Sequence, residues 1–281
     1  MNPKDKLLAN IEDFPTLPTI YHNLMNAMSD PSSTVSDVAD VITVDQSTTI
    51  KLLKFANSPM FGLTQKVDSI SDAIFYIGFN EVRNIVISLS VMNLFDEFKS
   101  NLHFNIVDLW KHSIAVGTIA RIYGESFGTR NLENYFVGGI LHDIGKLLFI
   151  KSYNRRYLDL LEDVYENKNV LNKKEEEVFG FDHSQAGALM AKKWGLPGSI
   201  IKTIKHHHKG VSGDGFDRQT ACVHLGNITA NLLEMGSAGN DIVDRPNKEI
   251  WNELDVREDH FTGLHDRINL AYNDSIGILK L

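Results

Sequence analysis

The sequence predicts an all-α fold: a multi-helix bundle with a separate helical subdomain towards the N-terminus. Apolar residues recur at helical spacing along most of the 281 residues, and no run alternates in the way that a half-buried strand requires. Proline, glycine and asparagine interrupt this pattern at short intervals and divide it into short helices. Such short helices are not stable alone in water, so we expect them to bury their apolar faces against one another.

Composition and charge narrow the class of protein. Apolar residues make up 43% and charged residues 23%, which is ordinary for a globular chain long enough for one large domain or two small ones. The net charge of −8, without a basic tract, argues against nucleic-acid binding and against a basic membrane surface. The single cysteine, Cys222, cannot form an internal disulfide and is expected in the core. Residues 1–13 lack the apolar centre of a signal peptide, so we expect a cytoplasmic protein.

The first half of the chain predicts five amphipathic helices after a short initial one. The initial helix, around residues 7–11, ends before Pro15, because proline disfavours helix in the residue that precedes it. Thr34 with Asp37 three residues later is typical of a helix start, and Asn57 before Ser58 and a proline is typical of a helix end. The five helices are expected at residues 20–28, 34–42, 50–57, 69–78 and 80–94.

The second half follows a predicted break at residues 99–101. Its helices are expected at 106–123, around the pair 142–143, around 157–161, around 173–177, at 182–194, at 198–208, at 221–228 and at 264–276. The charged run 173–177 is interpreted as a solvated face. We expect a domain at residues 14–235, made of subdomains 14–98 and 102–235, and a C-terminal helical extension at 236–281. The apolar stripe of Leu264, Ile268 and Ala271 predicts that the extension packs on the core.

A histidine–aspartate pair, His142-Asp143, lies in a run of small and apolar residues from Gly138 to Leu148. A buried aspartate is costly unless it is paired or binds a metal ion. One interpretation is a packed helix in which the two side chains bond to each other or to the backbone. The other is a metal site, for which other helices would have to supply the remaining ligands.

Further histidines fall on other predicted helices, at His112, His183, His207 and His208. Taken singly, each has a plainer interpretation as a core histidine, a capped histidine or a solvated helix end. Imidazole and carboxylate groups together suit first-row transition metals, and a helical bundle can bring such ligands together. The set therefore favours a site for one or two ions of iron, manganese, zinc or nickel. That prediction fails if His112, His183 and His207 lie far from Asp143.

Several motifs in order carry a resemblance to a known family. They are Leu17-Pro18, Asn57-Ser58-Pro59, residues 73–78 (AIFYIG), residues 109–113 (LWKHS), and residues 194–197 (WGLP) before His207-His208. Over roughly residues 14 to 230 the chain resembles the HDOD domain. That domain is an all-helical module of the HD phosphohydrolase superfamily, related to the HD-GYP phosphodiesterases. The resemblance implies an HD-like bundle in the second half of the chain.

The resemblance also implies a ligand set. It comprises the first histidine His112, the pair His142 and Asp143, the additional histidines His183, His207 and His208, and a further carboxylate at Asp108. Two features depart from the pattern. The final aspartate of the HD pattern falls at Asn227, whose neutral amide is a poorer metal ligand. The glycine-tyrosine-proline segment of the HD-GYP group is absent, because residues 209–216 read KGVSGDGF.

Three functions follow as hypotheses. The favoured one is a bacterial signal-transduction module that acts through a protein partner, without nucleic acid or membrane, its metal site retained or partly degenerate; a homodimer stays open. The second is a metal-dependent phosphohydrolase in which a metal-activated water attacks a phosphodiester or a nucleotide. Lys146 would then neutralise phosphate charge, although a surface position is an equal alternative. In the third, the metal is bound but serves only as a structural support or a sensor.

Overall fold

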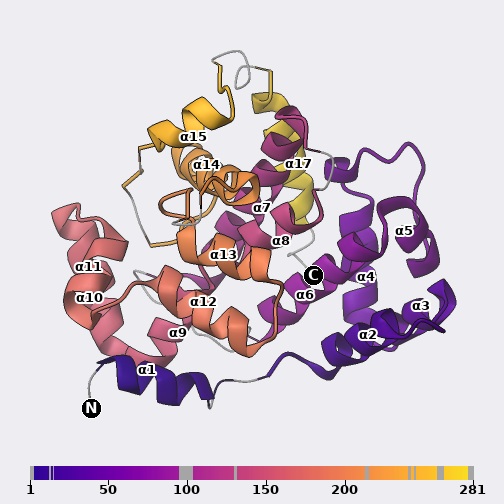
Figure 1. Cartoon of the computed structure of the whole chain (residues 1–281), viewed down its shortest axis with the longest axis horizontal. Coiled ribbons are helices and arrows are strands. Elements are labelled where there is room, and N and C mark those ends of the chain that lie inside the picture. Colours follow the sequence, from indigo (N-terminus) through magenta and orange to yellow (C-terminus); the bar gives the residue numbers. More distant parts are fainter. Residues whose placement is uncertain are drawn as a thin grey trace. The chain divides into compact units, whose positions relative to one another are not determined.

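Helices dominate the structure, a computed structural model in which residues 3–12, 14, 16–94, 104–129, 132–212, 215–239, 242–243, 245–257 and 263–277 are described (Figure 1). Within these residues no β-strand is formed, and an isolated β-bridge joins Ser212 and Gly215. The prediction of an all-α fold is therefore confirmed. The expected break at 99–101 lies outside the described residues.

The chain forms two compact units. The first unit comprises Met1–Pro15 and Glu97–Leu264, and the second comprises Thr16–Asp96 and His265–Leu281. The first contains α1 (Pro3–Glu12), α7 (Ile106–Ser126), α8 (Glu133–Leu141), α9 (Ile144–Tyr153), α10 (Arg155–Asn167), α11 (Leu171–Phe179), α12 (His183–Lys193), α13 (Gly198–His206), α14 (Arg218–Leu232) and α15 (Lys248–Glu253). The second contains α2 (Thr19–Ser29), α3 (Val35–Thr43), α4 (Gln46–Ala56), the 3₁₀ helix η1 (Pro59–Phe61), α5 (Ile70–Ile77), α6 (Phe79–Asn93) and α17 (His265–Gly277).

This division splits the expected extension at 236–281. Its first part, which includes the unpredicted helix α15, belongs to the first unit, whereas α17 belongs to the second and contacts η1. Ile268 and Ala271 are buried in α17, in agreement with the apolar stripe in the sequence. The initial helix α1 also joins the first unit rather than the helices that follow it in sequence. Periodicity within a helix does not specify which distant helix will cover its apolar face.

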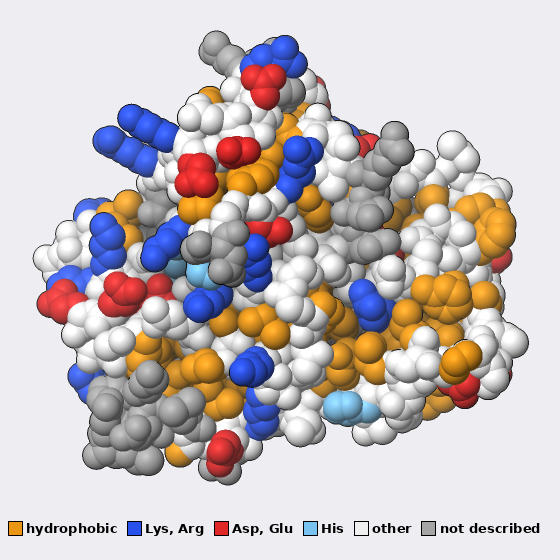
Figure 2. Space-filling view, in the orientation of Figure 1, with side chains coloured by type: hydrophobic (Ala, Val, Ile, Leu, Met, Phe, Trp, Pro, Cys, Tyr) orange, Lys and Arg blue, Asp and Glu red, His pale blue; other side chains and the backbone are white. Residues whose placement is uncertain are grey.

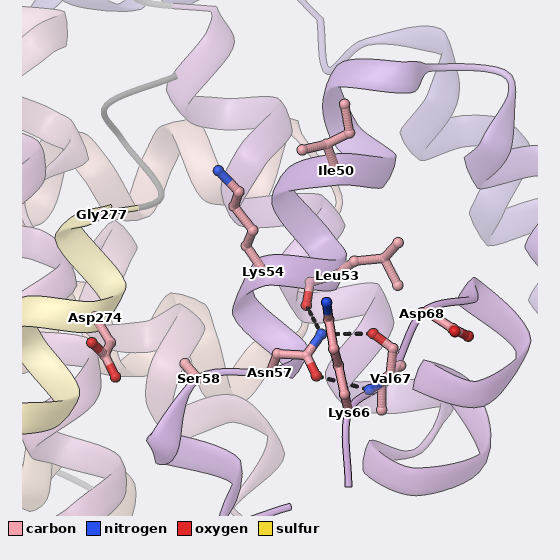
Figure 3. A pocket seen from close by; sticks show the side chains of 10 residues that line it. All are labelled: Ile50, Leu53, Lys54, Asn57, Ser58, Lys66, Val67, Asp68, Asp274 and Gly277. Atoms are coloured by element: carbon pink, nitrogen blue, oxygen red, sulfur yellow. Dashed lines mark hydrogen bonds between the residues drawn. The ribbon is translucent and has the colours of Figure 1, made fainter.

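The helix ends of the second unit follow from local polar side chains. Thr34 and Asp37 form a capping box at the start of α3, as their spacing predicts. Asn57 ends α4 with its amide group, which donates to Leu53 O and Val67 O and accepts from Val67 N (Figure 3). These bonds tie the end of α4 to the segment that leads into α5.

The core of the first unit depends on close helix contacts at glycine. A Cβ atom built on Gly139 of α8 would lie 2.3 Å from Gly117 Cα of α7. On α9, a Cβ atom at Gly145 would lie within van der Waals overlap of His183 O at the start of α12. These contacts allow α8 and α9 to lie directly against the helices that carry His112 and His183.

The hydropathy of the described helices bears on membrane association. None of them singly has the length and apolar character needed to cross a bilayer. Among them, the α5–α6 pair alone has that length and apolar character when its two helices are combined, and the chain bends by 119° between them.

Cys222 is completely buried in α14, as expected for a core cysteine. Burial raises the pKa of its thiol far above the usual value, because a thiolate would lose its hydration. We therefore expect the folded protein to resist alkylation by iodoacetamide at pH 8, and the urea-unfolded protein to react fully. Mass spectrometry of timed samples measures this directly, since Cys222 is the only cysteine. Rapid alkylation without urea would contradict the burial of Cys222.

Candidate metal centre

Six candidate side chains converge in the first unit. His112 lies on α7, His183 begins α12, and His207 and His208 follow directly after α13. Their potential ligand atoms form two groups, each within 4.8 Å: one of His183, His207 and His208, the other of His112, His142 and Asp143. Asp143 joins the groups, because its Oδ1 lies 3.0 Å from His183 Nε2 and 3.7 Å from His207 Nε2. The convergence expected from the sequence is therefore present.

The prediction of one helix around His142 and Asp143 is wrong. Helix α8 ends at Leu141 and α9 begins at Ile144, so the pair forms the junction between two helices. Asp143 has φ −99° and ψ 9°, which departs from helical geometry. The break lets adjacent side chains approach one site: His142 Nε2 lies 3.2 Å from Asp143 Oδ2.

Backbone carbonyl groups orient two of the imidazoles. Gly139 O lies 2.6 Å from His142 Nδ1, and Ile204 O lies 2.7 Å from His207 Nδ1. A carbonyl oxygen can only accept, so Nδ1 carries the proton in each ring and, in the neutral ring, Nε2 carries the lone pair. Metal-binding histidines commonly show this arrangement, with one nitrogen donating to a carbonyl and the other directed at the ion.

The spacing around Asp143 Oδ1 fits one small ion. Ligand atoms about 2.1 Å from a tetrahedral ion lie about 3.4 Å from one another. His183 Nε2 lies 2.9 Å from His208 Nε2 and 3.0 Å from Asp143 Oδ1. His207 Nε2 lies 3.7 Å from the same oxygen. The donors are therefore close to the separations that coordination requires, and imidazole with carboxylate is a suitable donor set.

Burial and neighbouring charges set the protonation of the group. Burial lowers the pKa of His207 and His208 well below the usual value, so both rings are neutral. Burial would raise the pKa of Asp143, but electrostatic interactions with His142 and Lys146 outweigh it and hold the pKa well below the usual value. Burial would likewise lower the pKa of His183, but the Glu175 charge raises it to about 9. Without a metal, a proton on His183 can bridge to His208.

Glu175 corrects the interpretation of the run 173–177 as a solvated face. Its side chain is 0% exposed, and its Oε2 accepts from His183 Nδ1 at 2.5 Å and from His183 N at 2.8 Å. Oε1 accepts from the Tyr157 hydroxyl at 2.6 Å. Leu171, Glu175 and Phe179 are buried at four-residue intervals on α11. In the sequence, this spacing places Glu175 on the same helix face as two apolar residues, which indicates that it is buried. The charged residues beside it obscured this signal.

The remaining candidates have different positions. Lys146, which the sequence left open as a surface residue, is buried and donates to Asp143 Oδ2 at 2.7 Å and to Ala238 O at 2.9 Å. Asn227 lies beside His112, with 2.9 Å between Oδ1 and Nε2. Asp108 does not join either metal-binding group, because its partly exposed carboxylate pairs with Lys111 at 2.7 Å.

The metal-binding candidates are mostly enclosed. His112, His142, His183 and His207 are each 0% exposed, and only small patches of histidine reach the face shown in Figure 2. A cavity of about 590 Å³ in the second unit is lined by Lys54, Lys66 and Asp274, among others, and by no metal-binding candidate (Figure 3). A second cavity, of about 450 Å³, lies along α12 and α13 and is likewise lined by none of them.

Comparison with known proteins identifies the domain. Residues 14–210 match the family model of the HDOD domain. An uncharacterized protein of Treponema pallidum (strain Nichols) is 26% identical over 202 residues, which cover 70% of this chain and 38% of that protein. The uncharacterized protein YuxH of Bacillus subtilis (strain 168) is 35% identical over 128 residues, 46% of this chain and 30% of that protein. The chain thus spans about a third of these relatives' length.

Solved structures share the fold over nearly the whole chain. An HDOD domain protein with unknown function from Geobacter sulfurreducens is 26% identical, with a TM-score of 0.78, over 99% of this chain and 98% of that one. A protein from Shewanella amazonensis SB2B, provisionally named a metal-dependent phosphohydrolase, is 17% identical, with a TM-score of 0.68, over 97% and 96% of the two chains. One from Marinobacter aquaeolei VT8, provisionally named a signal transduction protein, is 17% identical, with a TM-score of 0.74, over 99% and 66%.

Proposed function

Because the chain belongs to the HDOD domain family, we propose that it is a signal-transduction module built around a buried divalent metal ion. One observation carries the proposal. The lone pair of His207 Nε2 faces the Asp143 carboxylate at 3.7 Å, and this nitrogen has no hydrogen-bond partner within the described chain. A buried acceptor that faces a carboxylate is unfavourable unless a cation lies between them.

The ion would be held by His183, His207, His208 and Asp143. These residues come from the start of α9, the start of α12 and the end of α13, which are distant in sequence. An ion that binds only this arrangement stabilises it, and the stabilisation rises with the logarithm of the ion concentration once that exceeds the dissociation constant. Metal binding would thereby control how firmly α9, α12 and α13 are held together, and this change would be the input to the signalling module.

Metal content tests the proposal. Tag-free protein purified without chelator or nickel resin should contain close to one equivalent of iron, manganese or zinc by mass spectrometry. His207→Ala should lose the metal. The matched control is His206→Ala, because His206 is the adjacent residue of the same type and belongs to neither ligand group. A folded wild-type protein that contains no metal and takes up none would overturn the proposal.

A metal-dependent phosphohydrolase is the second candidate, and the donor set favours it. A bound divalent ion would supply Lewis-acid polarisation of a phosphoryl oxygen and would acidify a bound water. Lys146 places a buried ammonium group beside Asp143, where it could neutralise phosphate charge. Turnover of a phosphodiester or nucleotide above a His142→Ala Asp143→Ala control would favour this candidate. The absence of turnover from metal-loaded protein across such a screen would favour the signalling role.

The signalling role requires a protein partner, which we propose rather than a nucleic acid. The net charge of −8 disfavours attraction to phosphate backbones. The name of the Marinobacter aquaeolei protein, which shares the fold, is in line with signalling. Comparing the proteins retained by immobilised metal-loaded and metal-free protein would show whether the ion controls the interaction.

A further inference from the structure

The two ligand groups differ in what already satisfies them. In the group of His183, His207 and His208, the nitrogen lone pair of His207 is directed at Asp143 and has no hydrogen-bond partner within the described chain. In the group of His112, His142 and Asp143, His142 Nε2 likewise has no hydrogen-bond partner within the described chain, but Asp143 Oδ2 accepts from Lys146 and His112 Nε2 contacts Asn227 Oδ1. The difference concerns two residues, Lys146 and Asn227.

The Lys146 ammonium group lies beside Asp143, in the second group, which is that of His112, His142 and Asp143. Its Nζ is 2.7 Å from Asp143 Oδ2 and 2.9 Å from Ala238 O, and its side chain is buried. The ammonium group therefore already binds Asp143 Oδ2, the carboxylate oxygen to which a second ion would bind. Moving it away would leave a buried charge without its partners, which is strongly unfavourable.

Asn227 gives the group of His112, His142 and Asp143 one negative charge fewer than an aspartate would. Its side chain also leaves His112 Nε2 without a lone pair. The Asn231 side-chain amide donates to Asn227 O at 2.9 Å and to Asn227 Oδ1 at 3.1 Å, which identifies Oδ1 as an acceptor. His112 Nε2, 2.9 Å from the same oxygen, must then donate its proton. A protonated nitrogen cannot bind a metal. In the neutral ring the lone pair then lies on Nδ1, away from this contact.

The charges in the buried centre agree with a single ion. Because a metal-bound imidazole is neutral, the charged groups beside the ion would be Lys146 on the positive side and Asp143 and Glu175 on the negative side. One divalent ion would leave a single excess positive charge, which one bound anion can cancel. Two divalent ions would leave three excess positive charges in a region that excludes water, and burying such an excess of charge is strongly unfavourable.

We propose that the centre binds one divalent ion, through His183, His207, His208 and Asp143 Oδ1, and that the Lys146 ammonium group occupies the place of a second. The inference rests on the proposed metal-binding function but goes beyond it, because it determines the number of ions and their position. His142 Nε2 stays 3.2 Å from Asp143 Oδ2. A single imidazole cannot retain a second ion, since protein sites generally use at least three ligands.

Manganese titration of metal-free protein tests the number of ions. Isothermal titration with Mn²⁺ should give one equivalent for the wild type, and electron paramagnetic resonance should show the hyperfine pattern of an isolated Mn(II). The double variant Lys146→Met Asn227→Asp, which removes the ammonium group and supplies a carboxylate, should bind two equivalents with the spectrum of an exchange-coupled pair. Lys151→Met, an exposed lysine on the same helix, is the matched control and should bind one.

The outcomes separate this inference from the proposed function. Two coupled ions in the wild type would overturn the single-ion inference and leave the metal-binding function intact. A double variant that is folded by circular dichroism and still binds one ion would also overturn it, because Lys146 and Asn227 would then not exclude the second ion. No binding by the folded wild type would overturn both.

Discussion

Gly145→Ala is expected to destabilise the first unit by about 3 kcal/mol or more and to abolish metal binding. The added Cβ would overlap His183 O and lie 2.7 Å from Gly187 N, and both are backbone atoms of α12. A backbone cannot rotate aside as a side chain can, so α9 and α12 must separate. That separation lengthens the 3.0 Å distance between Asp143 Oδ1 and His183 Nε2. Urea unfolding and metal content would measure the two effects.

Gly198→Ala provides the control for this change. Gly198 begins α13, and an added Cβ there would have no atom within 4 Å. Alanine is also more favourable than glycine in a helix, by up to about 1 kcal/mol. We expect unchanged metal content and an unchanged or slightly higher unfolding midpoint. If Gly145→Ala retained the wild-type midpoint and metal content, the close contact between α9 and α12 would be wrong.

Glu175→Gln is expected to weaken metal binding by about 10- to 100-fold, although Glu175 is not a candidate ligand. The carboxylate holds His183 in place by accepting from both its Nδ1 and its backbone N, and Tyr157 holds the carboxylate. Glutamine keeps the size but removes the charge that makes His183 a stronger donor to a metal. Titration calorimetry with Mn²⁺ would measure the change in affinity.

The neighbouring acid offers a close control. Glu176→Gln makes the same chemical change one residue away, at an exposed position of α11, and should leave the affinity unchanged. Wild-type affinity in both variants would show that Glu175 does not act through His183. Equal losses in both would indicate a general effect of charge rather than positioning.

The helices and the candidate ligands were predictable from local patterns. The apolar period of 3.6 residues depends only on which face of a helix is buried, so it revealed the all-α class without knowledge of the packing. Capping is also local, and Thr34 with Asp37 forms the predicted capping box. The His142-Asp143 pair and the other histidines were found by residue type, because few side chains can bind a transition metal.

The sequence by itself therefore determined the class of fold, the position of most helices and the residues that converge. Only the tertiary structure decided that His142 and Asp143 form a junction between helices, that Glu175 is buried against His183, and that α17 belongs to the second unit. The physical reason is the range of the interactions. Caps and periodicity act within one or two helical turns. By contrast, whether a charge is buried depends on helices that are distant in sequence: Lys146 and Ala238, which form one hydrogen bond, are separated by 92 residues.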